Sequence, residues 1–271
     1  MTLVLPRFVL PLTSDSVLEN HGVAFDANGV IEEVLPRDSA LQKYPSYKMI
    51  ERPEHVMLPG FVNAHSHCGL TLLRGIADDM SLQQWLREFI WPAESTFNGQ
   101  GDDFMRTSVR LSVAEALRGG TTCFGDMYFR PSVTAKVFRE TGIRGVIGCN
   151  IFEFEMPGAG TCAKEYLQEG EALMKQVHAQ RDEADGMITY CPAPHAPYTV
   201  SEDTFQECHR MATEYQTPLM THLQETDAEV RASLAPKSDV ADGAPRHLSE
   251  HCCTPTQNLR RLGLLNERFI A

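Results

Sequence analysis

From residue 58 onward, the chain alternates short apolar segments with longer segments that carry a helical pattern. Apolar segments of this length are typical of buried strands, and strands that alternate with helices form a parallel sheet. Such a sheet is either doubly wound or a (β/α)8 barrel. We expect six strands, over residues 58–64, 121–127, 144–151, 187–191, 218–222 and 268–271.

Sequence motifs of an open nucleotide-binding sheet are missing. No G-x-G-x-x-G follows an expected strand, and the sequence contains no P-loop, so the barrel is favoured. The sequence also lacks a G-x-S-x-G elbow, which leaves serine-hydrolase chemistry without its nucleophile. Because the fourth expected strand ends at Tyr190 and Cys191 and not at a lysine, a lysine-bridged pair of metal ions is not supported.

Two capping boxes mark where helices begin. In a capping box, a Ser or Thr and a Gln or Glu three residues later each satisfy a backbone amide at the helix start. The sequence contains such boxes at Ser81-Leu-Gln-Gln84 and Thr199-Val-Ser-Glu202. We expect Pro92 to end the first of these helices, because proline lacks the amide hydrogen that a helix interior requires.

The two ends of the chain differ from this pattern. Segments 17–25 and 30–35 flank Asp26-Ala-Asn-Gly29, and Asn-Gly is a strong hairpin signal. Residues 1–57 are therefore expected to form a small β unit. Residues 235–256 are the least regular part, and we expect a surface loop there without a second metal site.

The charge balance bears on the class of partner. The chain has 36 acidic against 24 basic residues, a net charge of −12. This excess argues against a nucleic-acid partner and against an anionic membrane surface, and leaves a small-molecule substrate. No apolar run approaches a membrane span. The eight cysteines form no C-x-x-C pair, which favours reduced thiols and a cytoplasmic location.

A candidate metal-binding motif, His65-Ser66-His67, stands at the end of the first expected barrel strand. Side chains two residues apart on a strand point to the same side, so both imidazoles can reach one ion. Imidazole is a common zinc ligand. The motif alone is equally compatible with two polar strand-end histidines. Its position favours the metal site, because chemistry in parallel barrels gathers at the C-terminal strand ends.

A second candidate segment, Thr221-His-Leu-Gln-Glu225, ends the fifth expected strand. His222 is a candidate third metal ligand. Glu225 reaches the same site only if the chain turns after Leu223, because residues three apart on a straight strand face opposite sides. A carboxylate beside an activated water can serve as general base. The alternative is a Glu at a helix start that the helix dipole favours.

Two further residues are candidates for binding substrate. His195 lies between two prolines in Pro194-His-Ala-Pro-Tyr198, which fixes its loop; it could bind substrate or stabilise negative charge, or be a surface histidine. Glu94 follows Trp91-Pro-Ala. Its two acceptor oxygens could meet sugar hydroxyls, or it could be a solvated carboxylate at a helix end.

Together, six segments of the chain resemble the amidohydrolase superfamily. The resemblance is to the branch that contains the 5-methylthioadenosine/S-adenosylhomocysteine deaminases and the triazine hydrolases, and it runs through essentially the whole chain. The segments are Leu58-Pro-Gly-Phe-Val-Asn-Ala-His-Ser-His67, Thr71-Leu-Leu-Arg-Gly75, Trp91-Pro-Ala-Glu94, Gly119-Gly-Thr-Thr122, Pro194-His-Ala-Pro-Tyr198 and Thr221-His-Leu-Gln-Glu225.

The resemblance implies a fold and a metal site. It implies a (β/α)8 barrel with a small β-sandwich built from both chain ends. Residues 1–57 would be the N-terminal part of that sandwich, and residues 58–271 a partial barrel that stops at the sixth strand. It further implies one divalent metal ion per subunit, zinc in most members, bound by His65, His67 and His222. A homo-oligomer is left open.

The resemblance also implies a reaction, the hydrolytic deamination of an adenine nucleoside with release of ammonia. Glu225 would shuttle protons, Glu94 would hold the ribose hydroxyls, and His195 would orient the substrate or the attacking oxygen. Two alternatives stay open. One is hydrolysis of a triazine, guanine or another aminated heterocycle, and the other is a non-catalytic truncated fragment.

The sequence departs from the family pattern at two points. The family supplies a further histidine after the sixth strand and a metal-binding aspartate after the eighth, and neither is reached by Ala271, so we expect a piece of a longer protein. The family deaminases also carry an arginine on the third strand that meets a substrate carboxylate. Cys149, beside Asn150, takes that place here, which disfavours S-adenosylhomocysteine more than 5-methylthioadenosine.

Overall fold

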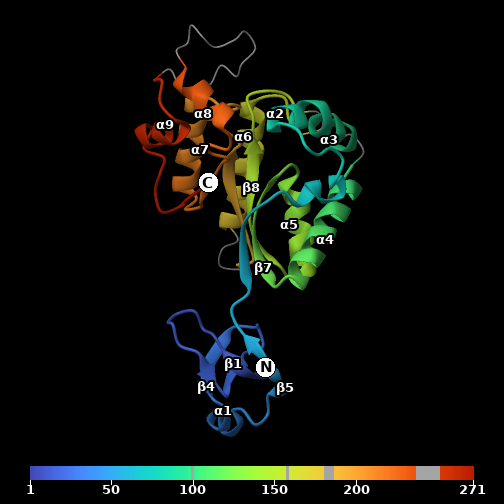
Figure 1. The fold of residues 1–271 in the computed structure, drawn as a ribbon, viewed down its shortest axis with the longest axis vertical. Helices are drawn as coiled ribbons and strands as arrows, with labels where there is room; N and C mark the ends of the chain where they lie inside the picture. The colour runs from blue at the N-terminus through green and yellow to red at the C-terminus, as the bar shows by residue number, and fades with distance from the viewer. Residues whose placement is uncertain (99–100, 157–158, 180–185, 236–250) are drawn as a thin grey trace. The chain divides into compact units, whose positions relative to one another are not determined.

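The structure is a computed structural model that describes residues 1–98, 101–156, 159–179, 186–235 and 251–271. These residues form two compact units, Met1–Phe61 and Val62–Ala271 (Figure 1). The expected surface loop at residues 235–256 lies largely outside the described residues. Along the described chain, no helix is both long enough and apolar enough to cross a membrane.

The first unit is a five-stranded sheet with one short helix, α1 (Arg37–Lys43), which the sequence pattern did not predict. The expected hairpin is present, because residues 21–25 pair antiparallel with residues 31–36. In its turn, Asp26 Oδ1 accepts hydrogen bonds from the amides of Asn28 and Val30 at 2.8 Å. A second sheet, which a sandwich needs, does not occur among the residues described for this unit and stays a prediction. The strands are β1 (Thr2–Val9), β2 (Leu18–Glu19), β3 (His21–Phe25), β4 (Ile31–Pro36) and β5 (Lys48–Met57).

The second unit contains all six expected strands. Four of them form one sheet in the order β6-β7-β8-β9, and β10 pairs with β11 in a second sheet. The β7–β8, β8–β9 and β10–β11 ladders are parallel, as predicted. Closure into an eight-stranded barrel stays a prediction. The strands are β6 (Phe61–Ser66), β7 (Thr121–Tyr128), β8 (Arg144–Ile151), β9 (Ile188–Pro194), β10 (Leu219–Met220) and β11 (Phe269–Ile270).

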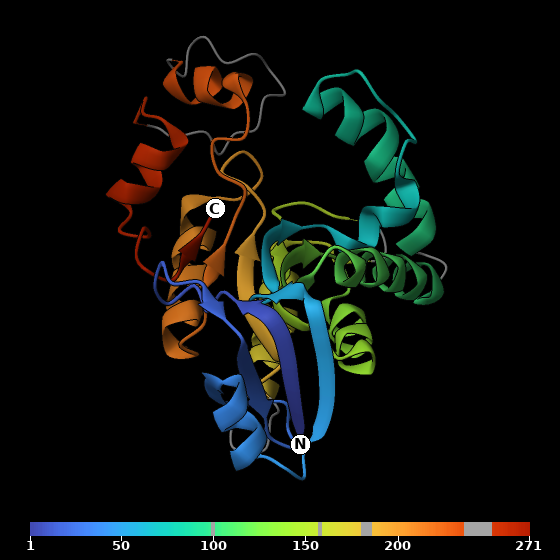
Figure 2. The ribbon, with the colours of Figure 1, turned by 60° about the horizontal axis from the view of Figure 1, so that its bottom comes forward.

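Helices pack against these strands (Figure 2). The main core lies between them and includes Val109, Phe138 and Met211 from helices and Ile147 from β8. Gly145 of β8 permits this packing, because a Cβ there would lie 2.5 Å from the Phe138 ring. The longer helices are α4 (Asp103–Arg118), α5 (Pro131–Thr141), α6 (Ala163–Ala179) and α7 (Glu202–Glu214), and α8 (Asp227–Leu234) and α9 (Pro255–Arg261) follow.

The prediction that Pro92 ends a helix is wrong. The helical run begins after Ser81, whose hydroxyl caps it as expected, and continues through α2 (Leu82–Trp85), the π-helix η2 (Leu86–Ile90) and α3 (Trp91–Asn98). Pro92 stands in the first turn of α3, where a proline is tolerated. The wider π-helical turn before it, in which the Trp91 amide donates to the Leu86 carbonyl oxygen, lets the helix continue.

The prediction that Thr199 caps the next helix is also wrong. Helix α7 is capped two residues later by Ser201, whose hydroxyl accepts a hydrogen bond from the Thr204 amide at 3.2 Å. Thr199 is still in a turn, because its amide donates to the Ala196 carbonyl oxygen. Its hydroxyl is therefore directed toward the candidate site, 2.9 Å from Nδ1 of His195.

Candidate active site

Three histidines converge at the ends of two strands. His65 is the fifth residue of β6, His67 directly follows this strand, and His222 lies two residues after β10. Their ring centroids are 4.9 to 5.2 Å apart, and their candidate ligand nitrogens lie within 4.8 Å of one another. The structure thus brings together the three side chains that the sequence singled out as metal ligands.

The rings of His67 and His222 are oriented by backbone carbonyl groups. Nδ1 of His67 lies 2.6 Å from the Met127 oxygen, and Nδ1 of His222 lies 2.9 Å from the His195 oxygen. Because a carbonyl oxygen only accepts, each Nδ1 carries the hydrogen, and in a neutral ring Nε2 then carries the lone pair. These two Nε2 atoms face each other at 3.1 Å.

This arrangement fits a metal ion. Two nitrogen lone pairs at this distance are stabilised by a cation that both of them bind. Nitrogen ligands 2.0–2.1 Å from a tetrahedral ion are roughly 3.3 to 3.4 Å apart, close to the spacing found here. Burial and the neighbouring His67 lower the pKa of His222 to about 4, and the same causes lower the pKa of His65. Both rings are therefore neutral near pH 7, the form that binds metal.

His195 lies in the interior of the site and is not a surface histidine. Its ring stacks on Phe152 at a centroid distance of 4.5 Å and lies 5.0 Å from the ring of His222. Burial lowers the pKa of His195 well below its ordinary value, and the nearby histidines add to the effect. With Nδ1 beside the Thr199 hydroxyl, a neutral His195 can present Nε2 to a bound molecule.

Glu225 reaches the same cleft because the chain turns at Gln224. Gln224 has φ +56°, a left-handed conformation that breaks the strand direction after Leu223. Two contacts then hold Glu225: the Tyr198 hydroxyl donates to its Oε2 at 2.9 Å, and its amide donates to Glu229 at 2.7 Å. The turn after Leu223 that Glu225 needs in order to reach the site is therefore present.

Glu94 is buried and is not the solvated helix-end carboxylate of the alternative interpretation. Its side chain lines the cleft from α3, and its Oε1 accepts a hydrogen bond from the Tyr128 hydroxyl at 2.7 Å. Burial raises the pKa of Glu94 to about 7, although the hydrogen bond from Tyr128 opposes the rise. Both the neutral and the ionised carboxyl are therefore populated near neutral pH.

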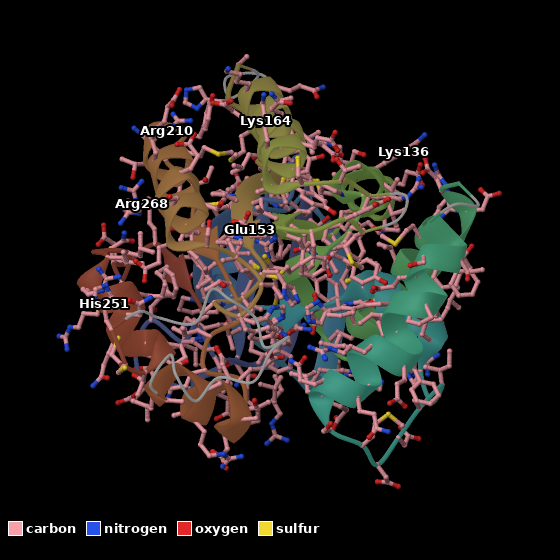
Figure 3. The ribbon with its side chains drawn as sticks, turned by 90° about the horizontal axis from the view of Figure 1, so that it is seen from above. Lys136, Glu153, Lys164, Arg210, His251 and Arg268 are labelled. Atoms are coloured by element: carbon pink, nitrogen blue, oxygen red, sulfur yellow. The ribbon has the colours of Figure 1, made fainter. Side chains whose placement is uncertain are left out.

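The charged residues of the cleft are acidic. Glu94 and Glu225 line it, and its described lining includes no lysine or arginine. In the view of Figure 3, the labelled cations Lys136, Lys164 and Arg210 lie around the outside of the unit. Apolar and aromatic side chains make up most of the remaining wall, namely Leu70, Leu82, Trp85, Leu86, Ile90, Trp91, Phe129 and Phe152.

The structure corrects the expectation for the third strand. Cys149 is buried toward α6, where a Cβ added to Gly170 would lie 3.1 Å from the Cys149 Cβ. Asn150, the next residue of β8, lines the cleft in its stead. Its Oδ1 is shielded from solvent and has no hydrogen-bond partner among the described residues. The polar group that β8 presents to the cleft is therefore a neutral amide.

Comparison with known proteins agrees with this geometry. Residues 56–268 match the amidohydrolase family. The chain belongs to this family. The resemblance inferred from the six sequence segments is thereby confirmed.

Among curated proteins, this amidohydrolase is similar to deaminases of adenine nucleosides. It is 34% identical over 233 residues to a 5-methylthioadenosine/S-adenosylhomocysteine deaminase of Saccharophagus degradans, covering 86% of this chain and 50% of that protein. It is 34% identical over 263 residues to a 5′-deoxyadenosine deaminase of Methanopyrus kandleri, covering 97% of this chain and 56% of that protein. The chain spans about half the length of the curated relatives it matches.

Solved structures share its fold. An adenosine deaminase from Xanthomonas campestris with bound zinc is 36% identical, with a TM-score of 0.84, over 99% of this chain and 56% of that one. The atrazine chlorohydrolase TrzN from Arthrobacter aurescens is 21% identical, with a TM-score of 0.80, over 99% of this chain and 60% of that one. At this lower identity the second likeness concerns the fold alone.

The sequence did not reveal the roles of two residues near the site of this amidohydrolase. Tyr198 ends the segment Pro194-His-Ala-Pro-Tyr198, but its contact with Glu225 crosses 27 residues and depends on the fold. Asp126 is fully buried in β7 and contacts the H-x-H segment. A lone aspartate inside an apolar strand was the available signal, because a buried carboxylate requires a specific partner.

Proposed function

We propose that this chain forms the metal-binding and proton-transferring part of a zinc-dependent hydrolase that deaminates adenine nucleosides. The observation that carries the proposal is the pair of Nε2 atoms of His67 and His222, 3.1 Å apart, in the cleft that Glu225 also lines. The deaminase names of relatives at 34% identity support this substrate class. The bound zinc of the solved relative supports the choice of metal.

His65, His67 and His222 would hold the ion through their ring nitrogens. A divalent ion of this kind supplies Lewis-acid chemistry, which makes water a nucleophile near neutral pH. The chain's own part is to orient the three rings. The carbonyl groups of Met127 and His195 do this for His67 and His222 by accepting from Nδ1.

Glu225 would move the protons of the reaction. Its carboxylate takes a proton from the attacking water and gives it to the purine ring nitrogen, while the water oxygen bonds to the carbon that carries the amino group. The amino group then receives the second proton of that water and leaves as ammonia, as the C–N bond breaks and the C=O bond forms. The hydrogen bond from Tyr198 fixes one carboxylate oxygen and leaves the other available for this transfer.

Glu94 and His195 would bind the substrate. Glu94 would accept hydrogen bonds from the two ribose hydroxyls, and His195 would orient the base or the attacking oxygen through Nε2. Further parts of the proposal are that β6 to β11 are six strands of a (β/α)8 barrel and that residues 1–57 are the N-terminal part of a sandwich. A cytoplasmic location also belongs here, supported by eight cysteines without a disulfide.

The role of Glu94 predicts a pH-dependent KM. Its pKa of about 7 means that the ionised form, which accepts from both hydroxyls, becomes more populated as the pH rises through 7. The KM for a nucleoside is therefore expected to fall between pH 6 and pH 8. We expect Glu94→Gln to raise this KM by about 10- to 100-fold and to abolish the dependence. The free base adenine, measured in parallel, has no ribose and should respond to neither change.

The proposed activity is tested by ammonia release from zinc-loaded protein. 5′-Deoxyadenosine, adenosine, 5-methylthioadenosine and S-adenosylhomocysteine are compared with guanine and with an aminated triazine, and the ultraviolet spectrum reports conversion of the amino-purine to the oxo-purine. We expect turnover of at least one nucleoside and of neither comparison compound. Turnover of guanine or the triazine alone would move the assignment to that class. Zinc binding without any turnover would leave a metal-binding, non-catalytic chain.

A further inference from the structure

Strand β7 contacts the H-x-H segment at successive residues. The Ser66 hydroxyl lies 3.1 Å from the Gly125 carbonyl oxygen, and Nδ1 of His67 donates to the Met127 carbonyl oxygen at 2.6 Å. The two strands approach closely here, because a Cβ added to Gly125 would lie 2.6 Å from the Ala64 carbonyl oxygen. The residue of β7 between these two contacts is Asp126, whose side chain has no assigned role in the reaction.

Asp126 caps the helix that follows the metal ligand. The 3-10 helix η1 (Cys68–Leu73) begins directly after His67, and His67 makes no side-chain hydrogen bond to the first amides of η1. The His67 ring is occupied instead by the Met127 oxygen on one side and His222 on the other. Asp126 Oδ1 accepts the hydrogen bond of the Cys68 amide at 2.7 Å, one of the first-turn amides that a helix leaves without an intrahelical partner.

The contact is enclosed by protein. The Asp126 side chain is 0% exposed, and its Oδ1 also lies 3.1 Å from the Ser66 hydroxyl. One carboxylate oxygen therefore binds the residues on both sides of His67. Loss of this oxygen would leave a buried amide at Cys68 without a partner, which favours a rearranged backbone.

We infer that Asp126 is a positioning residue for the metal ligand His67. Its carboxylate replaces the missing cap of η1 and fixes the backbone at which His67 directs Nδ1 to a carbonyl group and Nε2 to the ion. The inference concerns how the metal is held, and in that respect it rests on the proposed function. It requires no role for Asp126 in the chemical steps.

The test measures zinc affinity by competition with a chromophoric chelator. We expect Asp126→Ala to raise the zinc dissociation constant by about 10- to 100-fold, as removal of outer partners of metal ligands does. Asp126→Asn keeps an oxygen that can accept from Cys68 and is expected to stay within about threefold of the unchanged protein. The visible spectrum of the cobalt-loaded protein, which reports ligand geometry, should change in the Ala variant alone.

Ser108→Ala is the matched control. Ser108 is buried in α4, and its hydroxyl contacts η1 at the carbonyl oxygens of Cys68 and Gly69, 3.0 and 2.8 Å away. Its removal destabilises the same helix without touching Ser66 or His67. Urea unfolding of all variants measures the loss of stability, and we expect Ser108→Ala to keep its zinc affinity and its cobalt spectrum.

Three results would overturn the inference: an unchanged zinc affinity in Asp126→Ala, an equal loss in Ser108→Ala, or a loss in Asp126→Asn as large as that expected for Ala. The last of these decides the matter even if the Ala variant does not fold. Because the chelator assay needs no turnover, an absence of deaminase activity would contradict the proposed function and leave this result standing. Zinc that binds the unchanged protein elsewhere would overturn both.

Discussion

Glu225→Gln is expected to keep its zinc and to lose turnover by about 10²- to 10⁴-fold, the usual contribution of a positioned general base. The carboxamide has the shape of the carboxylate and can still accept the hydrogen bond that Tyr198 donates at 2.9 Å. It cannot take a proton from water near neutral pH. The change therefore isolates proton transfer from geometry, and kcat with the metal content of the same sample measures it.

Two further variants serve as comparisons for Glu225→Gln. Tyr198→Phe removes only the hydrogen bond to Glu225, so we expect a loss of about tenfold with the carboxylate still present. Glu115→Gln makes the same chemical change at an exposed residue that pairs with Arg74, and it should leave kcat unaltered. Full activity in Glu225→Gln at full zinc content would remove Glu225 from the proton-transfer role and leave it a carboxylate before α8 that the helix dipole favours, or a substrate contact.

The strands were predictable because their signal is local. Residues 144–151 were expected as a strand and match β8 to the residue, since an apolar run bounded by polar residues is defined by the run itself. The first strand is displaced, from the expected 58–64 to Phe61–Ser66, because Pro59 and Gly60 delay its start. The capping motif gave the wrong start for α7, because a contact with another residue decides it. Thr199 is drawn into a turn next to His195, and Ser201 takes over the cap.

The candidate site was predictable to the extent that its residues stand at strand ends. The proximity of His65, His67 and His222 could be predicted, because the C-terminal ends of parallel strands lie at one edge of the sheet. Glu225 needed one further fact, the left-handed turn at Gln224, which nothing in the sequence required. The structure supplies that turn, and with it a carboxylate in the histidine cleft.

The supporting contacts could not be predicted, because they depend on how strands align. Asp126 reaches Cys68 across 58 residues of sequence, and only the register of β6 against β7 brings the two together. Likewise, Asn150 and Cys149 are neighbours on β8, and the pleat decides which of them faces the cleft. A shift of one residue would have exchanged their positions, which no motif records.

His222→Ala is expected to weaken zinc binding by more than roughly 10- to 100-fold, the effect of removing a residue that hydrogen-bonds to a metal ligand, because it removes a ligand itself. Zinc bound to the folded chain stabilises it by about 2.7 kcal/mol at a free concentration 100 times the dissociation constant. We expect thermal unfolding of the unchanged protein to shift upward with added zinc and that of His222→Ala to stay fixed. His55→Ala, an exposed histidine of β5, should respond like the unchanged protein.

The pH at which zinc is released should also depend on His222. Protons compete with the ion for the histidine lone pairs, and burial lowers the pKa of His222 to about 4, so protonation of this ring opposes binding only in acid. Zinc is therefore expected to remain bound well below pH 6.5, the ordinary histidine pKa, and to be released as the pH falls toward 4. Release centred near pH 6.5 would contradict this effect of the low pKa of His222, and a zinc-dependent shift that survives in His222→Ala would place the ion on other donors, such as the exposed Cys162 or Cys252.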